Sequence, residues 1–249
     1  MIAIPAKKSD LGVRTASAVV MVSIVAATSW SGPMAWFALV LLVGLICYAE
    51  LIVLVYKAFR EWPKRIFAGL AGFVYVGSAI SILTFLPFSI LYHGTTPEGG
   101  KYLGLAQLAS VIGLVVCTDV GAYFTGRAIG GPRIAPSISP SKTWAGLAGG
   151  MIFAGLWALL ALRLPTAIVG DLGWARPLAS YNVAAFISGA LMAVVSQAGD
   201  FLESWLKRRA GVKDSSVLIP GHGGVFDRID GLLPVAFVYG VFGDWLILR

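Results

Sequence analysis

The sequence predicts an all-α polytopic integral membrane protein with about seven to nine transmembrane helices. The first reason is composition: of 249 residues, 58% are hydrophobic and 12% are charged, and the mean hydropathy is +0.84. A soluble domain of this length could not hide so much apolar surface, because folding buries only about 75% of what the chain exposes. The composition therefore excludes a cytosolic globule, a disordered chain and a disulfide scaffold.

The second reason is a series of long apolar runs, each close to the roughly 20 residues that an α-helix needs to cross a bilayer. The seven runs cover residues 15–31, 34–57, 66–92, 102–118, 144–162, 181–199 and 231–248. The third run could cross once with tilt, or break near Gly77 or Pro87 into two shorter helices. The first run is not read as a signal peptide, because it lacks a clean cleavage site and further spans follow at once.

The third reason is the distribution of positive charge, which also predicts the orientation. With seven spans and a cytoplasmic N-terminus, 15 of the 19 Lys and Arg residues lie inside, and the exceptions are Lys101, Arg163, Arg176 and Arg249. A second crossing within 66–92 would reverse the side of every later basic loop, so a single crossing is favoured. Two polar loops, 119–143 and 200–230, then share the cytoplasmic side, and we expect the active site there.

The second polar loop combines carboxylates, basic residues and a glycine-flanked histidine. Helical spacing places four polar residues on one face: Asp200, Glu203, Ser204 and Lys207. Asp227 and Asp230 share a face if the last span begins there, and the glycines beside His222 allow backbone N–H groups to approach an anion. Mg²⁺ prefers one or two carboxylates plus substrate phosphates, so the segment suits a metal–phosphate site. The alternative is a solvated loop of paired charges, which this density of carboxylates at a membrane edge disfavours.

The first polar loop begins at Asp119, which follows an apolar run and is a functional candidate for that reason. Ser139, Lys142 and Thr143 are expected to open the next helix, whose N-terminus would offer N–H groups to a phosphate. The alternative is a helix cap with a lysine that extends toward water. Glu50, inside the second run, is expected to be a satisfied buried carboxyl or a support for the site.

Both loops resemble the phosphatidate cytidylyltransferases (CDP-diacylglycerol synthases). In the second loop the matching residues are Ser204, Lys207, Arg208, Lys213, Asp214, Ser216, Pro220, His222, Gly223, Gly224, Asp227, Arg228 and Asp230. The first loop carries similar Asp119-x-Gly-Ala-Tyr and Ser139-Pro-x-Lys-Thr runs, but the family usually has Glu where this chain has Ala145. The resemblance assigns residues 101–249 to a catalytic region, and we expect residues 1–100 to form scaffold helices with a possible dimer contact.

The resemblance implies transfer of a cytidylyl group from CTP to phosphatidate, which gives CDP-diacylglycerol and pyrophosphate for phospholipid biosynthesis. The lipid phosphate is already mostly a dianion at neutral pH, since its second pKa is about 6, so no Ser or Cys nucleophile is needed. We expect Asp200 and Asp227 to hold a catalytic Mg²⁺, alone or with a second cation, and Asp230 to assist. Lys207 and Arg208 would neutralise phosphate charge. The expected nucleotide-binding residues are Ser139, Lys142, Thr143, Asp119, Lys213, Asp214, His222, Gly223, Gly224 and Arg228.

Three further expectations concern partners, location and competing functions. The partners are CTP, phosphatidate and membrane lipids, without nucleic acid, and glycine-rich spans would permit a homodimer. The location is a bacterial-type plasma (inner) membrane, with the site facing the cytoplasm. The alternatives are a CTP-dependent polyprenol or phytol kinase and a transporter of an anionic solute. Crowding of basic residues on one face and the lack of paired broken helices disfavour a transporter.

Overall fold

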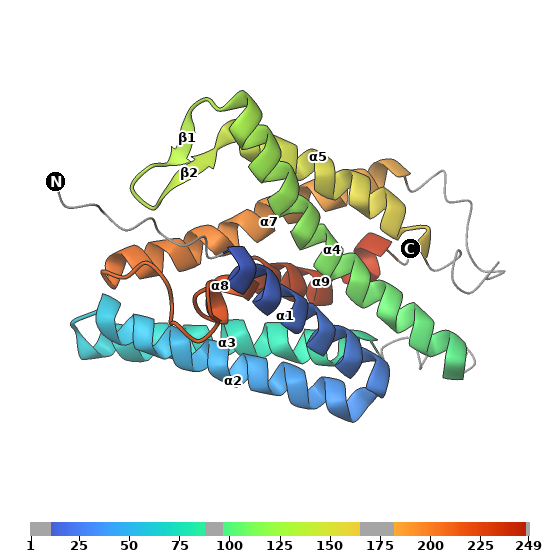
Figure 1. The fold of residues 1–249 in the computed structure, drawn as a ribbon, viewed down its shortest axis with the longest axis horizontal. Helices are drawn as coiled ribbons and strands as arrows, with labels where there is room; N and C mark the ends of the chain where they lie inside the picture. Colours follow the sequence, from blue (N-terminus) through green and yellow to red (C-terminus); the bar gives the residue numbers. More distant parts are fainter. Residues whose placement is uncertain (1–10, 88–96, 165–181, 248–249) are drawn as a thin grey trace.

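The computed structural model describes residues 11–87, 97–164 and 182–247. The elements are α1 (Leu11–Ser31), α2 (Pro33–Ala58), α3 (Trp62–Phe85), α4 (Pro97–Ile129), β1 (Arg133–Ala135), β2 (Ser139–Thr143), α5 (Trp144–Ala161), α7 (Asn182–Arg209), α8 (Phe226–Ile229) and α9 (Leu232–Ile247). Figure 1 shows long helices packed side by side, with α2 and α3 on one side and α4, α5 and α7 on the other. Helices α8 and α9 lie between these two groups (Figure 1).

Six helices of the described part are long and apolar enough to cross a membrane: α1, α2, α3, α4, α5 and α7. The prediction of a helical, polytopic membrane protein is therefore confirmed, while the number of crossings stays a prediction. The seventh run forms α9, whose 16 residues extend about 24 Å, less than the hydrocarbon core of about 30 Å. Residues 66–85 of the third run lie in α3, which passes uninterrupted through Gly77 and ends at Phe85, two residues before Pro87. Residues 88–92 lie outside the described residues, so the choice between one crossing and two stays a prediction.

The two polar loops differ from their expected form, because helices extend far into both of them. Helix α4 continues past Asp119 to Ile129, and α7 continues past Asp200 to Arg209. Asp119 therefore lies inside a helix and does not end one. The polar face expected on α7 is a real helix face, because the helix geometry that places i and i+3 together continues through this segment.

The expectation that no strands occur is wrong for the first loop. Strands β1 and β2 form a short antiparallel hairpin in which Arg133 is opposite Thr143. Ser139 and Lys142 therefore lie on a strand and do not open a helix, whereas Thr143 caps α5 by accepting a 3.0 Å hydrogen bond from the N–H of Gly146. Pro140 explains the change, since it has no N–H group and biases the preceding residue toward extended backbone.

Small residues allow α5 to pack closely against its neighbours. A Cβ atom added to Gly189 of α7 would lie 2.5 Å from the carbonyl oxygen of Ala154 on α5, and 2.7 Å from Cβ of Ala158. A Cβ atom on Gly121 of α4 would lie 2.7 Å from the carbonyl oxygen of Gly149 on α5. Glycine at such positions is the usual way in which membrane helices approach each other closely. This packing brings the hairpin and the last turns of α7 to the same end of the bundle (Figure 1).

A pair of glycine substitutions tests this packing. Gly189→Ala should lower the free energy of unfolding by about 1–3 kcal/mol, because the added methyl group overlaps α5. Gly77→Ala on α3 is the matched control, since a Cβ atom there meets no atom within 4 Å. It should leave stability unchanged or raise it by up to about 1 kcal/mol. Thermal unfolding in detergent, followed by tryptophan fluorescence, measures both, and equal midpoints would contradict the close contact of α5 with α7.

Candidate functional site

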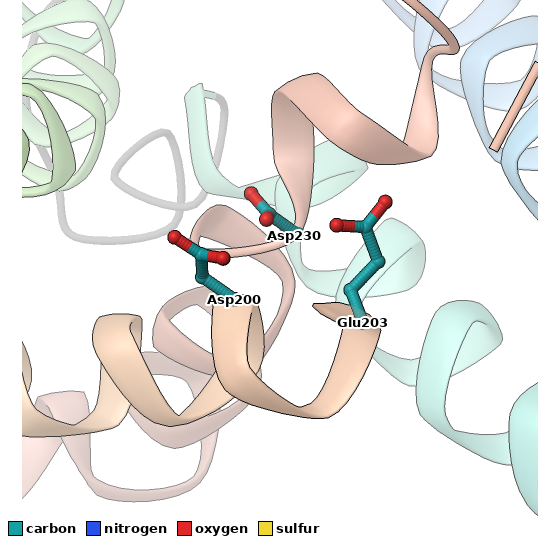
Figure 2. A group of neighbouring side chains, drawn as sticks. All are labelled: Asp200, Glu203 and Asp230. Carbon is teal, nitrogen blue, oxygen red and sulfur yellow. The ribbon is translucent and has the colours of Figure 1, made fainter. Parts of the chain in front are cut away.

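Three carboxylates converge where α7 passes the segment after α8. Asp200, Glu203 and Asp230 each offer an oxygen atom, and these atoms lie within 4.8 Å of one another. Figure 2 shows Asp200 and Glu203 on consecutive turns of α7, with Asp230 approaching from its own segment. Gly199 permits this approach, because a Cβ atom at that position would overlap the carbonyl oxygen of Asp230 and lie 2.6 Å from Pro234 Cγ. The acidic cluster, as we call these three residues, therefore depends on the packing of two segments.

Glu203 is the most buried member of the acidic cluster. Its side chain is only 1% exposed, and one of its oxygens, Oε2, accepts a 2.6 Å hydrogen bond from Lys207. The other oxygen, Oε1, has no hydrogen-bond partner among the residues that the structure describes. A buried carboxylate oxygen without a donor is costly, and a cation is one way to compensate it. The donor set consists only of hard oxygen atoms, which fits Mg²⁺.

Two lysines border the acidic cluster. Lys207 bridges Oε2 of Glu203 and Oδ1 of Asp227, at 2.6 Å from each. Lys142, which β2 contributes, forms an ion pair with Oδ2 of Asp200. The two lysines thus compensate part of the charge of four carboxylates. The remaining negative charge lies on the acidic cluster, which makes this region suitable for a divalent cation.

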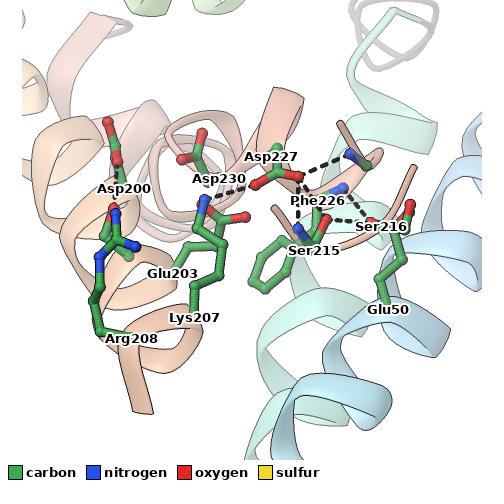
Figure 3. Close-up of polar contacts among 12 residues, drawn as sticks. Glu50, Asp200, Glu203, Lys207, Arg208, Ser215, Ser216, Phe226, Asp227 and Asp230 are labelled. Atoms are coloured by element: carbon green, nitrogen blue, oxygen red, sulfur yellow. Dashed lines mark hydrogen bonds and ion pairs between the residues drawn. The ribbon is translucent and has the colours of Figure 1, made fainter. Parts of the chain in front are cut away.

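Asp227 has a different environment from the acidic cluster (Figure 3). Its Oδ1 bonds Lys207, while its Oδ2 accepts hydrogen bonds of 2.8 to 2.9 Å from the backbone N–H and the hydroxyl of Ser215 and from the N–H of Gly224. Asp227 lies within the single turn of α8 and Asp230 caps its C-terminal end, so neither lies on α9, where the sequence predicts them. Both oxygens of Asp227 already accept hydrogen bonds from the protein, which disfavours Asp227 as a metal ligand. Its expected metal role stays a prediction.

The pKa values of these two aspartates move in opposite directions. Burial, together with the charge of Asp200, raises the pKa of Asp230 to about 7, although the N–H of Gly231 and nearby polar groups oppose the shift. Burial would also raise the pKa of Asp227, but Glu203, Lys207 and the two backbone N–H groups outweigh it. They hold the pKa of Asp227 well below its usual range. Asp227 is therefore ionised at neutral pH, whereas Asp230 exchanges a proton near pH 7.

The expected residues of the first loop surround the same region. Asp119 is exposed on α4 and lies within electrostatic range of Asp200 and Lys142. Ser139 is buried at the start of β2, and Thr143 is occupied as the cap of α5. Their expected contact with nucleotide phosphates stays a prediction, and Lys142 is the residue of this loop that the structure pairs with the acidic cluster.

The expected residues of the second loop divide into exposed charged residues and a structured turn. Lys213, Asp214, Arg208 and Arg228 are all exposed. The Nε of Arg208 donates a 3.3 Å hydrogen bond to the carbonyl of Ile138, so this side chain connects α7 with the hairpin.

The structured turn contains His222, Gly223 and Gly224. Nδ1 of His222 lies 2.8 Å from Oγ of Ser17 on α1, so the turn contacts the first helix. Gly223 has a φ of +85°, a conformation that favours glycine. Gly224 donates its N–H to Asp227, so one glycine of the turn already serves a carboxylate of the protein. Its expected use by a nucleotide phosphate stays a prediction.

Two residues of the site were not assigned as such from the sequence. Glu203 was placed on the correct helix face but was given no metal role, although its spacing of three residues from Asp200 was a usable signal. Ser215 lies outside the matched motif positions. Its N–H donates to Asp227, and its hydroxyl, which has one proton, lies within hydrogen-bond distance of both Glu50 and Asp227. No local pattern indicates contact with Glu50, 165 positions away.

The fold and the site together define a polytopic membrane protein with an acidic, lysine-bordered centre suited to a divalent cation and phosphate groups. Residues 73–245 match the model of the Cytidylyltransferase family, and the chain belongs to this family. The resemblance that the two loops suggested is therefore confirmed at the level of the family.

Three bacterial proteins to which this chain is similar are all named phosphatidate cytidylyltransferase. A Brucella suis protein named phosphatidate cytidylyltransferase is 39% identical over 196 residues, which cover 78% of this chain and 62% of that protein's length. A Rickettsia felis protein of the same name is 30% identical over 238 residues, or 94% of either chain. A third, from Haemophilus influenzae, is 43% identical over 143 residues, which cover 57% of this chain and 46% of that protein.

The raised pKa of Asp230 predicts how cation binding depends on pH. A proton and a bound cation would compete for this carboxylate, so the apparent affinity for Mg²⁺ should rise as the pH increases through 7. The effect should reach about tenfold per pH unit on the acidic side. Calorimetric titration with Mg²⁺ across this range measures it, and Asp230→Asn should bind more weakly with a flatter pH profile. Wild-type binding that is independent of pH would contradict the assignment of Asp230.

Proposed function

We propose that this protein transfers the cytidylyl group of CTP to phosphatidate, with CDP-diacylglycerol and pyrophosphate as products. The observation that carries this function is the acidic cluster, which two lysines from separate segments border at one end of a membrane-spanning bundle. The relatives' shared name supports the choice of substrates, including the Rickettsia felis relative that aligns along 94% of both chains. Transfer to a lipid also accounts for the apolar helices that surround such a polar site.

The acidic cluster is the proposed metal site, with Asp200, Glu203 and Asp230 as ligands of Mg²⁺. The free oxygen of Glu203 and the mutual proximity of the three carboxylates support this set over one built on Asp227. A bound Mg²⁺ would neutralise the charge of the CTP phosphates and of the leaving pyrophosphate. The three carboxylates would orient it, while Asp227 holds Lys207 beside Glu203.

The reaction needs charge compensation more than it needs a base. An oxygen of the lipid phosphate attacks the α-phosphorus of CTP, and the bond from that phosphorus to the oxygen bridging to the β-phosphate breaks. The attacking phosphate is already mostly dianionic at neutral pH, so no side chain has to remove its proton. Lys142 and Lys207 would stabilise the developing negative charge, and the exposed Arg208 and Arg228 would attract the anionic substrates.

The proposed location is the inner membrane of a bacterium, with the site on the cytoplasmic side. The bacterial relatives support the location, and the concentration of Lys and Arg in the two polar segments supports the orientation. A homodimer is a further expectation that glycine-rich spans permit.

A pyrophosphate-release assay tests the function in detergent micelles that contain CTP, Mg²⁺ and phosphatidate. Glu203→Gln should lower turnover by about 100-fold or more, because it removes a charged ligand from the acidic cluster. Glu61→Gln is the matched control, since Glu61 is exposed and pairs only with the exposed Lys64 among described residues. Near wild-type turnover in Glu203→Gln would contradict the site. Release of CDP in place of pyrophosphate would indicate a lipid kinase.

Two aspartate variants separate a metal ligand from a residue that orients a lysine. Asp200→Asn should raise the Mg²⁺ concentration needed for half-maximal turnover by about tenfold or more. Asp227→Asn should instead lower kcat while it leaves the Mg²⁺ requirement close to wild type, because its partners are Lys207, Ser215 and Gly224. Mg²⁺ titrations of turnover distinguish the two, and an equal shift in both variants would return Asp227 to the metal ligands.

A further inference from the structure

Glu50 is a buried carboxylate in the middle of α2, far from the acidic cluster in sequence. Its residue exposure is 7%. Oε1 accepts hydrogen bonds from the hydroxyl of Ser216 at 2.6 Å and from the N–H of Val225 at 3.1 Å. Oε2 accepts from the hydroxyl of Ser215 at 2.9 Å and from the N–H of Phe226 at 2.8 Å. One side chain of a membrane helix therefore binds both ends of the 215–226 loop (Figure 3).

The backbone of the loop is adapted to this carboxylate. A Cβ atom added to Gly224 would lie 2.5 Å from Oε2 of Glu50 and would overlap the hydroxyl of Ser215. The absence of a side chain at position 224 thus lets Ser215 and Glu50 approach the backbone. Gly224 also donates its N–H to Asp227. Phe226, which ends the 215–226 segment and begins α8, is 2% exposed and belongs to the same apolar core as Leu54 of α2.

The loop connects Glu50 with the lysine of the site. The hydroxyl of Ser215 lies 2.9 Å from Oε2 of Glu50 and 2.9 Å from Oδ2 of Asp227, and its N–H donates to the same Oδ2. Asp227 in turn bonds Lys207, which contacts Glu203 of the acidic cluster. A continuous set of hydrogen bonds therefore runs from α2 to the cluster.

We propose that Glu50 is a positioning residue for the transfer reaction. It fixes the 215–226 loop against α2, so that Asp227 holds Lys207 in place and the loop keeps its shape for the nucleotide. Glu50 acts through Ser215 and the loop amides and does not touch substrate. This role presupposes the proposed cytidylyl transfer, and it gives part of the segment 1–100 a share in the site in addition to its scaffold role.

The chemistry of the four donors explains why a carboxylate is needed. A serine hydroxyl can rotate and accept a hydrogen bond, but a backbone N–H can only donate. In Glu50→Gln the side-chain NH₂ group would face the N–H of Val225 or of Phe226, which would leave one buried amide without an acceptor. An unsatisfied buried donor is costly, so the loop should move away from α2.

Four variants of the whole chain test the role in detergent micelles: Glu50→Gln, Ser215→Ala, the two combined, and Cys47→Ala. Glu50→Gln should raise the KM for CTP by about tenfold and leave the KM for phosphatidate near wild type. Hydrogen exchange at the amides of residues 215–226 should become faster in this variant. Cys47→Ala is the control, because Cys47 is a fully buried residue one turn earlier on α2, and it should keep both KM values within about twofold. Ser215→Ala combined with Glu50→Gln should be no worse than the more severe single variant, since both break the same connection.

The results separate this role from a general effect on folding and from the proposed function itself. A smaller amount of folded protein would lower the maximal rate without changing either KM, so unchanged KM values in Glu50→Gln would overturn the proposal. Unchanged hydrogen exchange of the loop would overturn it as well, as would strictly additive effects of Glu50→Gln and Ser215→Ala. If the wild-type protein releases no pyrophosphate, the proposed function fails, and CTP affinity and loop exchange then decide the role of Glu50 by the same criteria.

Discussion

The pairing of Lys207 with Glu203 and Asp227 is the interaction on which the site depends. Carboxylates are expensive to bury among apolar helices unless positive charge or hydrogen-bond donors compensate them. Lys207 compensates one oxygen of each partner, and the loop amides compensate the rest of Asp227. The second oxygen of Glu203 has no hydrogen-bond partner among the described residues, and Glu203 lies in the acidic cluster with Asp200 and Asp230. The charge that the protein does not neutralise internally is therefore concentrated where a cation and phosphates would meet.

Helix α7 takes part both in the packing of the bundle and in the site. Its first part packs through Gly189 against α5 within the apolar bundle, and its last turns carry the acidic cluster and the basic residues. Because the helix is continuous, the position of the cluster is fixed by the same packing that fixes the span. The hairpin adds Lys142 from one side, and α2 supports the 215–226 loop from the other through Glu50.

Sequence reasoning was most successful where the chemistry follows local spacing. The apolar runs located the helices, and the three-residue spacing of Asp200 and Glu203 placed both on one face of α7. It failed where pairing is not local. The hairpin consists of two short strands without alternating polarity. Its proline biases Ser139 toward extended backbone, and the pairing of β2 with β1 makes the segment that contains Lys142 extended rather than helical. The choice between Asp227 and Asp230 as a partner of Asp200 depends on one turn of α8, which no periodicity indicates.

The sequence by itself determined the membrane class, the approximate helices and the set of polar residues that belong to the family's two motifs. These properties depend on composition and on residues close together in the chain. Only the tertiary structure decided which carboxylates meet, because Asp200 and Asp230 are joined by the packing of Gly199 against the segment after α8. It alone also connected Glu50 with Ser215, 165 residues away. A hydrogen bond between distant residues depends on how helices pack, and that packing is not visible in any single segment.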